Sequence, residues 1–143
     1  MKKTLLSFVL MILFSLQSAF AVSLKGQQFE FKNGPTEWSE PIELSIRSVK
    51  MEKNNVDPVK LKIRVRATKK ILMGCRYEVE VSNVDTKGLR FAMRNSDNKL
   101  SFKLKGGDAK NGMIDSFTRG CKGIESCGEC ACDFYFEDIE AMK

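Results

Sequence analysis

The amino-acid sequence predicts an all-β fold, an antiparallel immunoglobulin-like β-sandwich of about seven to eight short strands behind a signal peptide. Several segments of the 143-residue chain alternate apolar and polar side chains with a period of two, the pattern of strands with one buried face. Clusters of Asn, Gly, Asp and Pro separate these segments and indicate turns. Beyond Ala21, no segment holds an apolar helical period over three turns.

The first 21 residues have the features of a secretory signal peptide. Lys2 and Lys3 precede an apolar run over residues 5–16, and Ala19-Phe20-Ala21 forms a small-residue cleavage pattern. The apolar run is shorter than the roughly 20 residues that span a bilayer. We therefore expect a secreted or periplasmic protein, not a membrane-spanning one, in which residues 22–143 form a single sandwich domain after cleavage near Ala21.

Residues 59–67 give the clearest strand. They read VKLKIRVRA, in which apolar side chains alternate with Lys and Arg over the whole segment. The same alternation predicts the other strands, and the turn signals Asn33-Gly34-Pro35 and Asn54-Asn55 separate the earliest of them. In chain order, the expected strands are 42–46, 59–67, 76–82, 88–94, 99–105, 112–119 and 132–138, with 27–32 as a weaker candidate and 112–119 the weakest of the main set.

An immunoglobulin-like arrangement makes a further prediction about the loops. If 59–67 through 132–138 are strands B to G, the BC, DE and FG loops gather at one end of the sandwich. The BC loop is then 68–75, the DE loop is 95–98, and the FG loop is the cysteine-rich segment CKGIESCGECAC that begins at Cys121. This arrangement places Cys75 beside the other four cysteines.

Export favours disulfides for these five cysteines, because disulfides persist outside the cytosol. Strand phase puts Cys75 in register with inward Tyr77, and it puts Cys121 four residues after Phe117, which is expected to point inward. These phases favour Cys121 bonded to Cys132, and Cys75 bonded to Cys127 or Cys130. Since five is odd, one thiol is expected to be free or to link a dimer. The disulfide candidates are Cys75, Cys121, Cys127, Cys130 and Cys132.

Two other interpretations of the cysteines stay open. Cys127 and Cys130 form a CxxC pair, the spacing of redox dithiols, although a strand pattern and not a helix follows it. Cys121, Cys127, Cys130 and Cys132 also supply four thiolates, enough for a tetrahedral zinc site. The tight CxC spacing and the oxidising compartment favour disulfides over both. We therefore expect no metal and no cofactor.

The chain contains no histidine, so it lacks a Ser-His-Asp triad, a Cys-His pair and any histidine-ligated metal. Paired carboxylates for glycoside hydrolysis remain formally available, but a small sandwich without long loops predicts no obvious cleft. We expect a protein that is not an enzyme and has no catalytic residues.

Charge is unevenly distributed, although the formal net charge is only +6. Residues 59–110 are strongly basic, whereas residues 125–143 are acidic. The favoured interpretation is that the cations of 59–67 solvate an outer strand face and are offset by Glu78 and Glu80 across the sheet. Nucleic acid is not expected, because the basic face lacks interleaved aromatics. The alternative is an anion-binding face formed by Arg90, Arg94, Lys99 and Lys103.

These features favour an exported, non-catalytic binding or accessory module that uses one loop end. Its expected partner is another protein or an acidic glycan at the cell surface. The alternatives are a structural component of a surface or periplasmic assembly and a small zinc-thiolate protein. Within the BC loop, burial of the apolar triplet 71–73 is the favoured interpretation, and an exposed contact patch is the alternative. The candidate contact residues are Lys69, Lys70, Ile71, Leu72, Met73, Asn95, Asp97, Lys122, Gly123 and Ile124.

Overall fold

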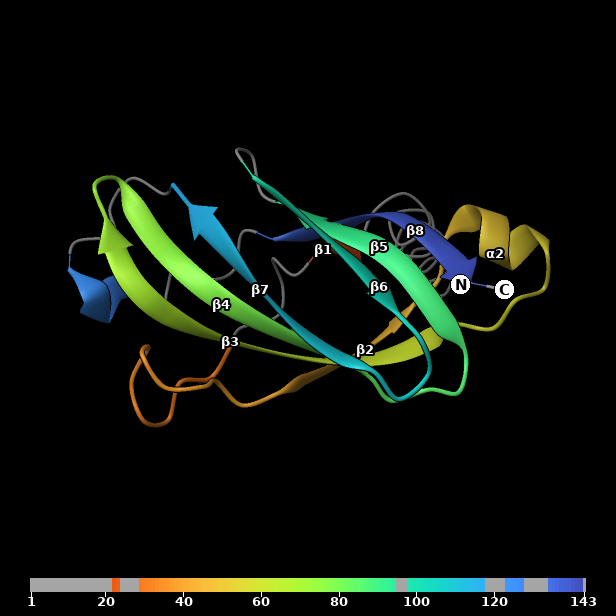
Figure 1. Ribbon diagram of the computed structural model, residues 1–143, viewed down its shortest axis with the longest axis horizontal. Helices are drawn as coiled ribbons and strands as arrows, with labels where there is room; N and C mark the ends of the chain where they lie inside the picture. Colours follow the sequence, from red (N-terminus) through yellow and green to blue (C-terminus); the bar gives the residue numbers. More distant parts are fainter. Residues whose placement is uncertain (1–21, 24–28, 95–97, 118–122, 128–133, 143) are drawn as a thin grey trace, which may run out of the picture.

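The computed structural model describes residues 22–23, 29–94, 98–117, 123–127 and 134–142, and it contains two antiparallel four-stranded sheets (Figure 1). The prediction of an all-β fold with two antiparallel sheets is confirmed. The predicted signal peptide lies outside the described residues. One sheet has the order β2-β3-β4-β7, with bounds Ile42–Ile46, Val59–Ile71, Gly74–Asn83 and Ala109–Ser116. The other has the order β1-β8-β5-β6, with bounds Val22–Ser23, Tyr135–Met142, Gly88–Arg94 and Lys99–Leu104.

The core lies between the two sheets and follows the period-two pattern of the sequence. Along β3, the alternate residues from Val59 to Ala67 are buried, and the intervening Lys and Arg side chains are exposed or half-buried. The second sheet contributes aromatic rings: Phe91 stacks on Phe102 at 5.4 Å between ring centroids and meets Phe136 edge-on at 5.2 Å. Aromatic pairs of this geometry add to the stability gained from area burial alone.

The order of strands within the sheets differs from the immunoglobulin assignment. That fold places strands B and C in different sheets. Here the predicted strands B and C are β3 and β4, which pair with each other over most of their length, from Leu61↔Asn83 to Ile71↔Gly74. The assignment is wrong because Leu72 and Met73 form a tight turn, so the expected BC loop is a hairpin within one sheet.

Two β-bulges lengthen strands beyond their predicted ends. In β3 the register shifts between Ala67 and Lys69, and the strand continues to Ile71 instead of ending at Ala67. In β8 the register shifts opposite Arg90 and Ala92, where Asp138 adopts a left-handed φ of 53°. The extra residue of a bulge reverses which positions of the strand face the core. The alternation of apolar and polar residues in the sequence therefore stops at each bulge.

A short helix, α2 (Val49–Lys53), is the only α-helix among the described residues. The Ser48 side chain accepts a hydrogen bond from the Met51 backbone N–H and caps it. Figure 1 shows α2 beside the C-terminal end of β8, at the opposite end of the molecule from the turn between β3 and β4. Within the described part of the chain, no helix has the length and apolar character needed to cross a membrane.

Candidate functional site

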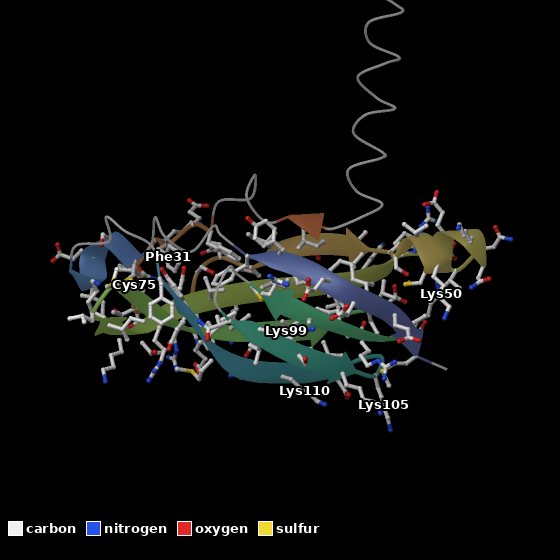
Figure 2. The ribbon with its side chains drawn as sticks, turned by 90° about the horizontal axis from the view of Figure 1, so that it is seen from above. Phe31, Lys50, Cys75, Lys99, Lys105 and Lys110 are labelled. Atoms are coloured by element: carbon white, nitrogen blue, oxygen red, sulfur yellow. A yellow bond between two sulfur atoms is a disulfide. The ribbon has the colours of Figure 1, made fainter. Side chains whose placement is uncertain are left out.

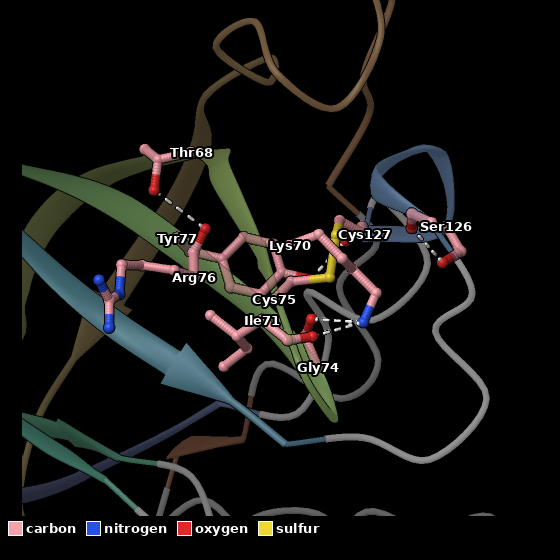
Figure 3. The surroundings of a disulfide bond; sticks show 10 residues. Thr68, Lys70, Ile71, Gly74, Cys75, Arg76, Tyr77, Ser126 and Cys127 are labelled. Atoms are coloured by element: carbon pink, nitrogen blue, oxygen red, sulfur yellow. Dashed lines mark hydrogen bonds between the residues drawn. A yellow bond between two sulfur atoms is a disulfide. The ribbon is translucent and has the colours of Figure 1, made fainter.

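The candidate site is the end of the sandwich where the β3–β4 hairpin is covalently tied to the segment after β7 (Figure 3). A disulfide joins Cys75 to Cys127, with 5.9 Å between the two Cα atoms, and both residues are fully buried. The predicted pairing of Cys75 with Cys127 or Cys130 is therefore confirmed in its first form. Cys121, Cys130 and Cys132 lie outside the described residues, so the pairing of Cys121 with Cys132 stays a prediction.

Strand pairing explains why these distant segments meet. Cys75 lies opposite Ser116, so β7 ends beside the start of β4, and the chain then returns through a helical turn over residues 124–127. The Tyr77 hydroxyl donates a buried hydrogen bond to the Cys127 carbonyl. The Tyr77 ring also meets Phe134 edge-on, at 5.9 Å between ring centroids. The disulfide and this hydrogen bond thus fix the helical turn against the hairpin, and the ring contact fixes Phe134 there as well.

Two apolar side chains project from the hairpin tip. Leu72 is 98% exposed and Met73 is 52% exposed, whereas Ile71 is half-buried. The favoured expectation that this triplet is buried is wrong for Leu72 and Met73. The turn places their side chains past the edge of the core, so the exposed-patch alternative describes the geometry.

Lys70 holds the turn in shape. Its ammonium group folds back and donates hydrogen bonds to the carbonyls of Ile71 and Gly74, both at 2.8 Å (Figure 3). These carbonyls flank Leu72 and Met73 in the chain. Lys70, which the sequence predicts to contact a partner, therefore stabilises the turn that exposes these two apolar residues. Lys69, one position earlier, is exposed.

Phe117 extends this apolar surface, and sequence reasoning placed it incorrectly. Ile114 and Ser116 are buried, so the even-numbered residues of β7 face the core. Phe117 follows them on the opposite face and is 48% exposed. Its backbone packs against Gly74, where an added Cβ would lie 2.9 Å from the Phe117 Cα. Because Met73 adjoins Gly74 in the chain, Phe117 lies beside the hairpin tip. We call Leu72, Met73 and Phe117 the apolar tip.

The other predicted contact residues divide into two groups. Gly123 is exposed with a φ of 74°, and Ile124 is half-buried and packs against the core. Asn95, Asp97 and Lys122 lie outside the described residues. The predicted DE loop is therefore described only at Asn98, whose side-chain amide donates to the Asp115 carbonyl at 2.9 Å.

The predicted anion-binding face lies beside the acidic C-terminal strand. Arg90 pairs with Glu140, Arg94 with Glu137 at 3.3 Å, and Lys99 with Asp138 at 2.6 Å. Lys103 is exposed on β6. Hydrogen bonding to Asp138 raises the pKa of Lys99, and hydrogen bonding from Arg90 lowers the pKa of Glu140. The basic middle and acidic end of the sequence thus neutralise one another across β5, β6 and β8.

The outer face of β3 is also internally paired. Arg64 contacts Glu80 and Arg66 contacts Glu78, both at 2.7 Å, as the interpretation of these cations as a charge-balanced strand face predicts. Both guanidinium groups also lie over the Trp38 ring, 4.5 and 4.6 Å from its centroid. Such stacking secures the segment around Trp38 on the sheet.

The disulfide also bears on the two other cysteine chemistries. Cys127 belongs to both the CxxC pair and the four-thiolate set, and a disulfide sulfur is not available as a thiolate ligand. Among the described residues, no three His, Cys, Asp or Glu side chains are grouped to hold a metal ion.

The fold and this end define the chain as an all-β protein of two antiparallel sheets with a disulfide-tied hairpin. Comparison of the chain with protein-family models, curated proteins and solved structures finds no significant match.

Proposed function

We propose that the protein is an exported, non-catalytic binding module that contacts a partner protein through the apolar tip. The observation that carries this proposal is Leu72, which is 98% exposed on a hairpin that a disulfide and two Lys70 hydrogen bonds hold in place. An isolated exposed leucine is common on protein surfaces, but clustered exposed apolar residues usually mark interaction sites. Here Met73 is the next residue in the chain and is also exposed, and exposed Phe117 follows with its backbone packed against Gly74.

The restraint of the tip supports a binding role. A flexible loop loses conformational entropy when it binds, and prior ordering reduces that cost. The Cys75–Cys127 bond fixes the base of the hairpin, and Lys70 fixes its turn. The disulfide also supports export, since such bonds form and persist in oxidising compartments.

A partner protein is favoured over an acidic glycan. Glycan recognition through Arg90, Arg94 and Lys99 would compete with the carboxylates of β8 that already pair with them. No such competition arises at the apolar tip, because the Leu72 side chain is almost wholly exposed and is not covered by the residues that the structure describes.

A site-specific cross-linking experiment tests the proposal. A photoreactive amino acid at position 72 should form an adduct with one defined cell-surface or periplasmic protein, and Leu72→Asp should abolish co-purification of that protein. Val84 provides a matched control, because it is 49% exposed and follows the opposite end of β4. The same photoreactive residue at position 84 should give no adduct, and Val84→Asp should leave co-purification unchanged.

Both Asp variants replace exposed side chains, so their melting temperatures should stay within about 2 °C of the parent protein. Equal adducts from positions 72 and 84, or co-purification that survives Leu72→Asp, would contradict binding through the apolar tip.

A further inference from the structure

A cavity of about 460 Å³ lies at the end of the molecule opposite the apolar tip. It is bounded by α2 and the segment after it, by the start of β5 and by the C-terminal end of β8. Figure 2 shows Lys50 on α2 at this end, far from Cys75 at the other. The lining residues that matter most are Lys50, Met51, Val56, Val59, Lys87 and Met142.

The interior of the cavity is apolar. Met51 and Val59 are buried, and Val56 and Ala141 are partly buried against the core cluster. Cavities that bind small molecules measure roughly 300–1000 Å³ and are lined mainly by apolar side chains. Volume and lining therefore fit a small apolar group. They do not fit an extended peptide, whose backbone would need hydrogen-bond partners inside the cavity.

The edge of the cavity is cationic. Lys50 and Lys87 line it and are exposed. Glu140 also lines the cavity, and its carboxylate forms an ion pair with Arg90. The Lys87 ammonium group lies 3.4 Å from the carboxylate of Asp57, whose side chain is 82% exposed. The edge thus carries two ammonium groups, Lys50 near the Glu140 carboxylate and Lys87 in contact with the highly exposed Asp57, and Glu140 itself is hydrogen-bonded to Arg90.

We propose that this cavity binds a single-chain amphiphile with an anionic headgroup, of which a medium-chain fatty acid is the simplest example. The hydrocarbon chain occupies the apolar interior between Met51, Val59 and Met142, and the carboxylate lies at the edge beside Lys50 and Lys87. This binding does not depend on the partner-protein site at the apolar tip, and either proposal can fail alone.

Calorimetric titration of the exported protein with saturated carboxylates from hexanoate to dodecanoate tests the apolar interior. Each methylene that enters the cavity should increase affinity about fourfold, which corresponds to about 0.8 kcal/mol, until the cavity is full. Longer chains should then bind no more tightly. Absence of binding at every length, or affinity that is independent of chain length, would overturn the proposal.

Matched charge variants test the edge. Lys50→Glu should weaken decanoate binding roughly fivefold or more and leave decanol binding unchanged, because only the carboxylate meets the altered charge. Lys53→Glu is the control, since Lys53 is exposed on the same helix but does not line the cavity. Decanol that binds as tightly as decanoate, or equal losses in the Lys50 and Lys53 variants, would show that the lysine edge does not recognise an anion.

A cavity-filling variant ties binding to this location. Val56 is only partly buried, so Val56→Phe should be accommodated by filling space and should reduce the affinity for decanoate at least tenfold. Decanoate binding that is unchanged in a folded Val56→Phe protein would place the ligand elsewhere. If that variant does not fold, the comparison of Lys50→Glu with Lys53→Glu decides alone, since both alter exposed side chains.

Discussion

Removal of the Cys75–Cys127 disulfide should lower the free energy of unfolding by about 4 kcal/mol. The bond joins residues 52 apart in sequence. In the chain-entropy account, a loop of this size removes about 14 cal/mol/K from the unfolded chain, which corresponds to about 4 kcal/mol at 25 °C. Stability in small domains is typically only 5–15 kcal/mol, so this loss is a large fraction of the total.

The double variant Cys75→Ala/Cys127→Ala is the appropriate perturbation, because it leaves neither residue of the pair as a buried thiol. At roughly 4 °C per kcal/mol for a domain of this size, the melting temperature should fall by about 15 °C. Urea unfolding followed by circular dichroism should also show a larger m value, since the unfolded chain without the cross-link exposes more surface.

Reduction and chelation separate the disulfide from a metal explanation. Dithiothreitol should destabilise the parent protein at least as much as the double variant, and EDTA should leave its urea midpoint unchanged. A double variant with the parent midpoint and m value would refute the entropic reasoning. A parent protein that unfolds in EDTA would show that a metal, and not this bond, holds the end together.

Two further predictions concern the pairing of β4 with β7. Gly74→Ala should destabilise the protein by about 1–3 kcal/mol in urea unfolding, because the new methyl would lie 1.8 Å from the Ser116 carbonyl oxygen. Gly112→Ala should cost less, because the three atoms nearest its new methyl all belong to the flexible Leu100 side chain. Equal costs of the two substitutions would contradict this account. Hydrogen bonds from Arg76 lower the pKa of Asp115 in the folded protein, so the unfolded chain binds this proton first as pH falls. The contribution of Asp115 to folding stability is therefore complete above about pH 4 and is lost as pH falls through the lower pKa of the folded state. Urea midpoints measured from pH 6 to pH 2 should therefore fall less steeply in Asp115→Asn than in the parent, and parallel curves would disprove the linkage.

The sequence predicts the interiors of the strands well because one buried face imposes a period of two. Val59 to Ala67 shows this most clearly. The pattern does not predict the ends of β3 and β8, since a bulge at each place inserts one residue and reverses the phase. Leu72 and Met73 likewise lack the Asn and Gly that usually mark a two-residue hairpin turn, so the sequence pattern does not predict a hairpin between β3 and β4.

The predicted pairing of Cys75 with Cys127 is confirmed although the topology behind it was wrong. In the immunoglobulin order, strands C and F also pair within one sheet, so Cys75 meets the last loop there as well. Here the same meeting follows from pairing within one sheet, because Cys75 lies opposite Ser116 and the chain leaves β7 beside it. The prediction depended only on β4 beginning where β7 ends, and both topologies share that feature. The exposure of Phe117 was missed because it depends on the phase of β7, the weakest pattern among the main strands.

The length of β3 separates the two proposed sites. Val59, its first residue, lines the cavity, and Ile71, its last, precedes the apolar tip. Thirteen residues of extended strand at about 3.3 Å each span roughly 40 Å. Substitutions more than about 10 Å apart without shared contacts usually have additive effects. Leu72→Asp should therefore leave amphiphile binding intact, and Lys50→Glu should leave binding of the partner protein intact. Loss of both functions in either variant, at an unchanged melting temperature, would contradict the independence of the two sites.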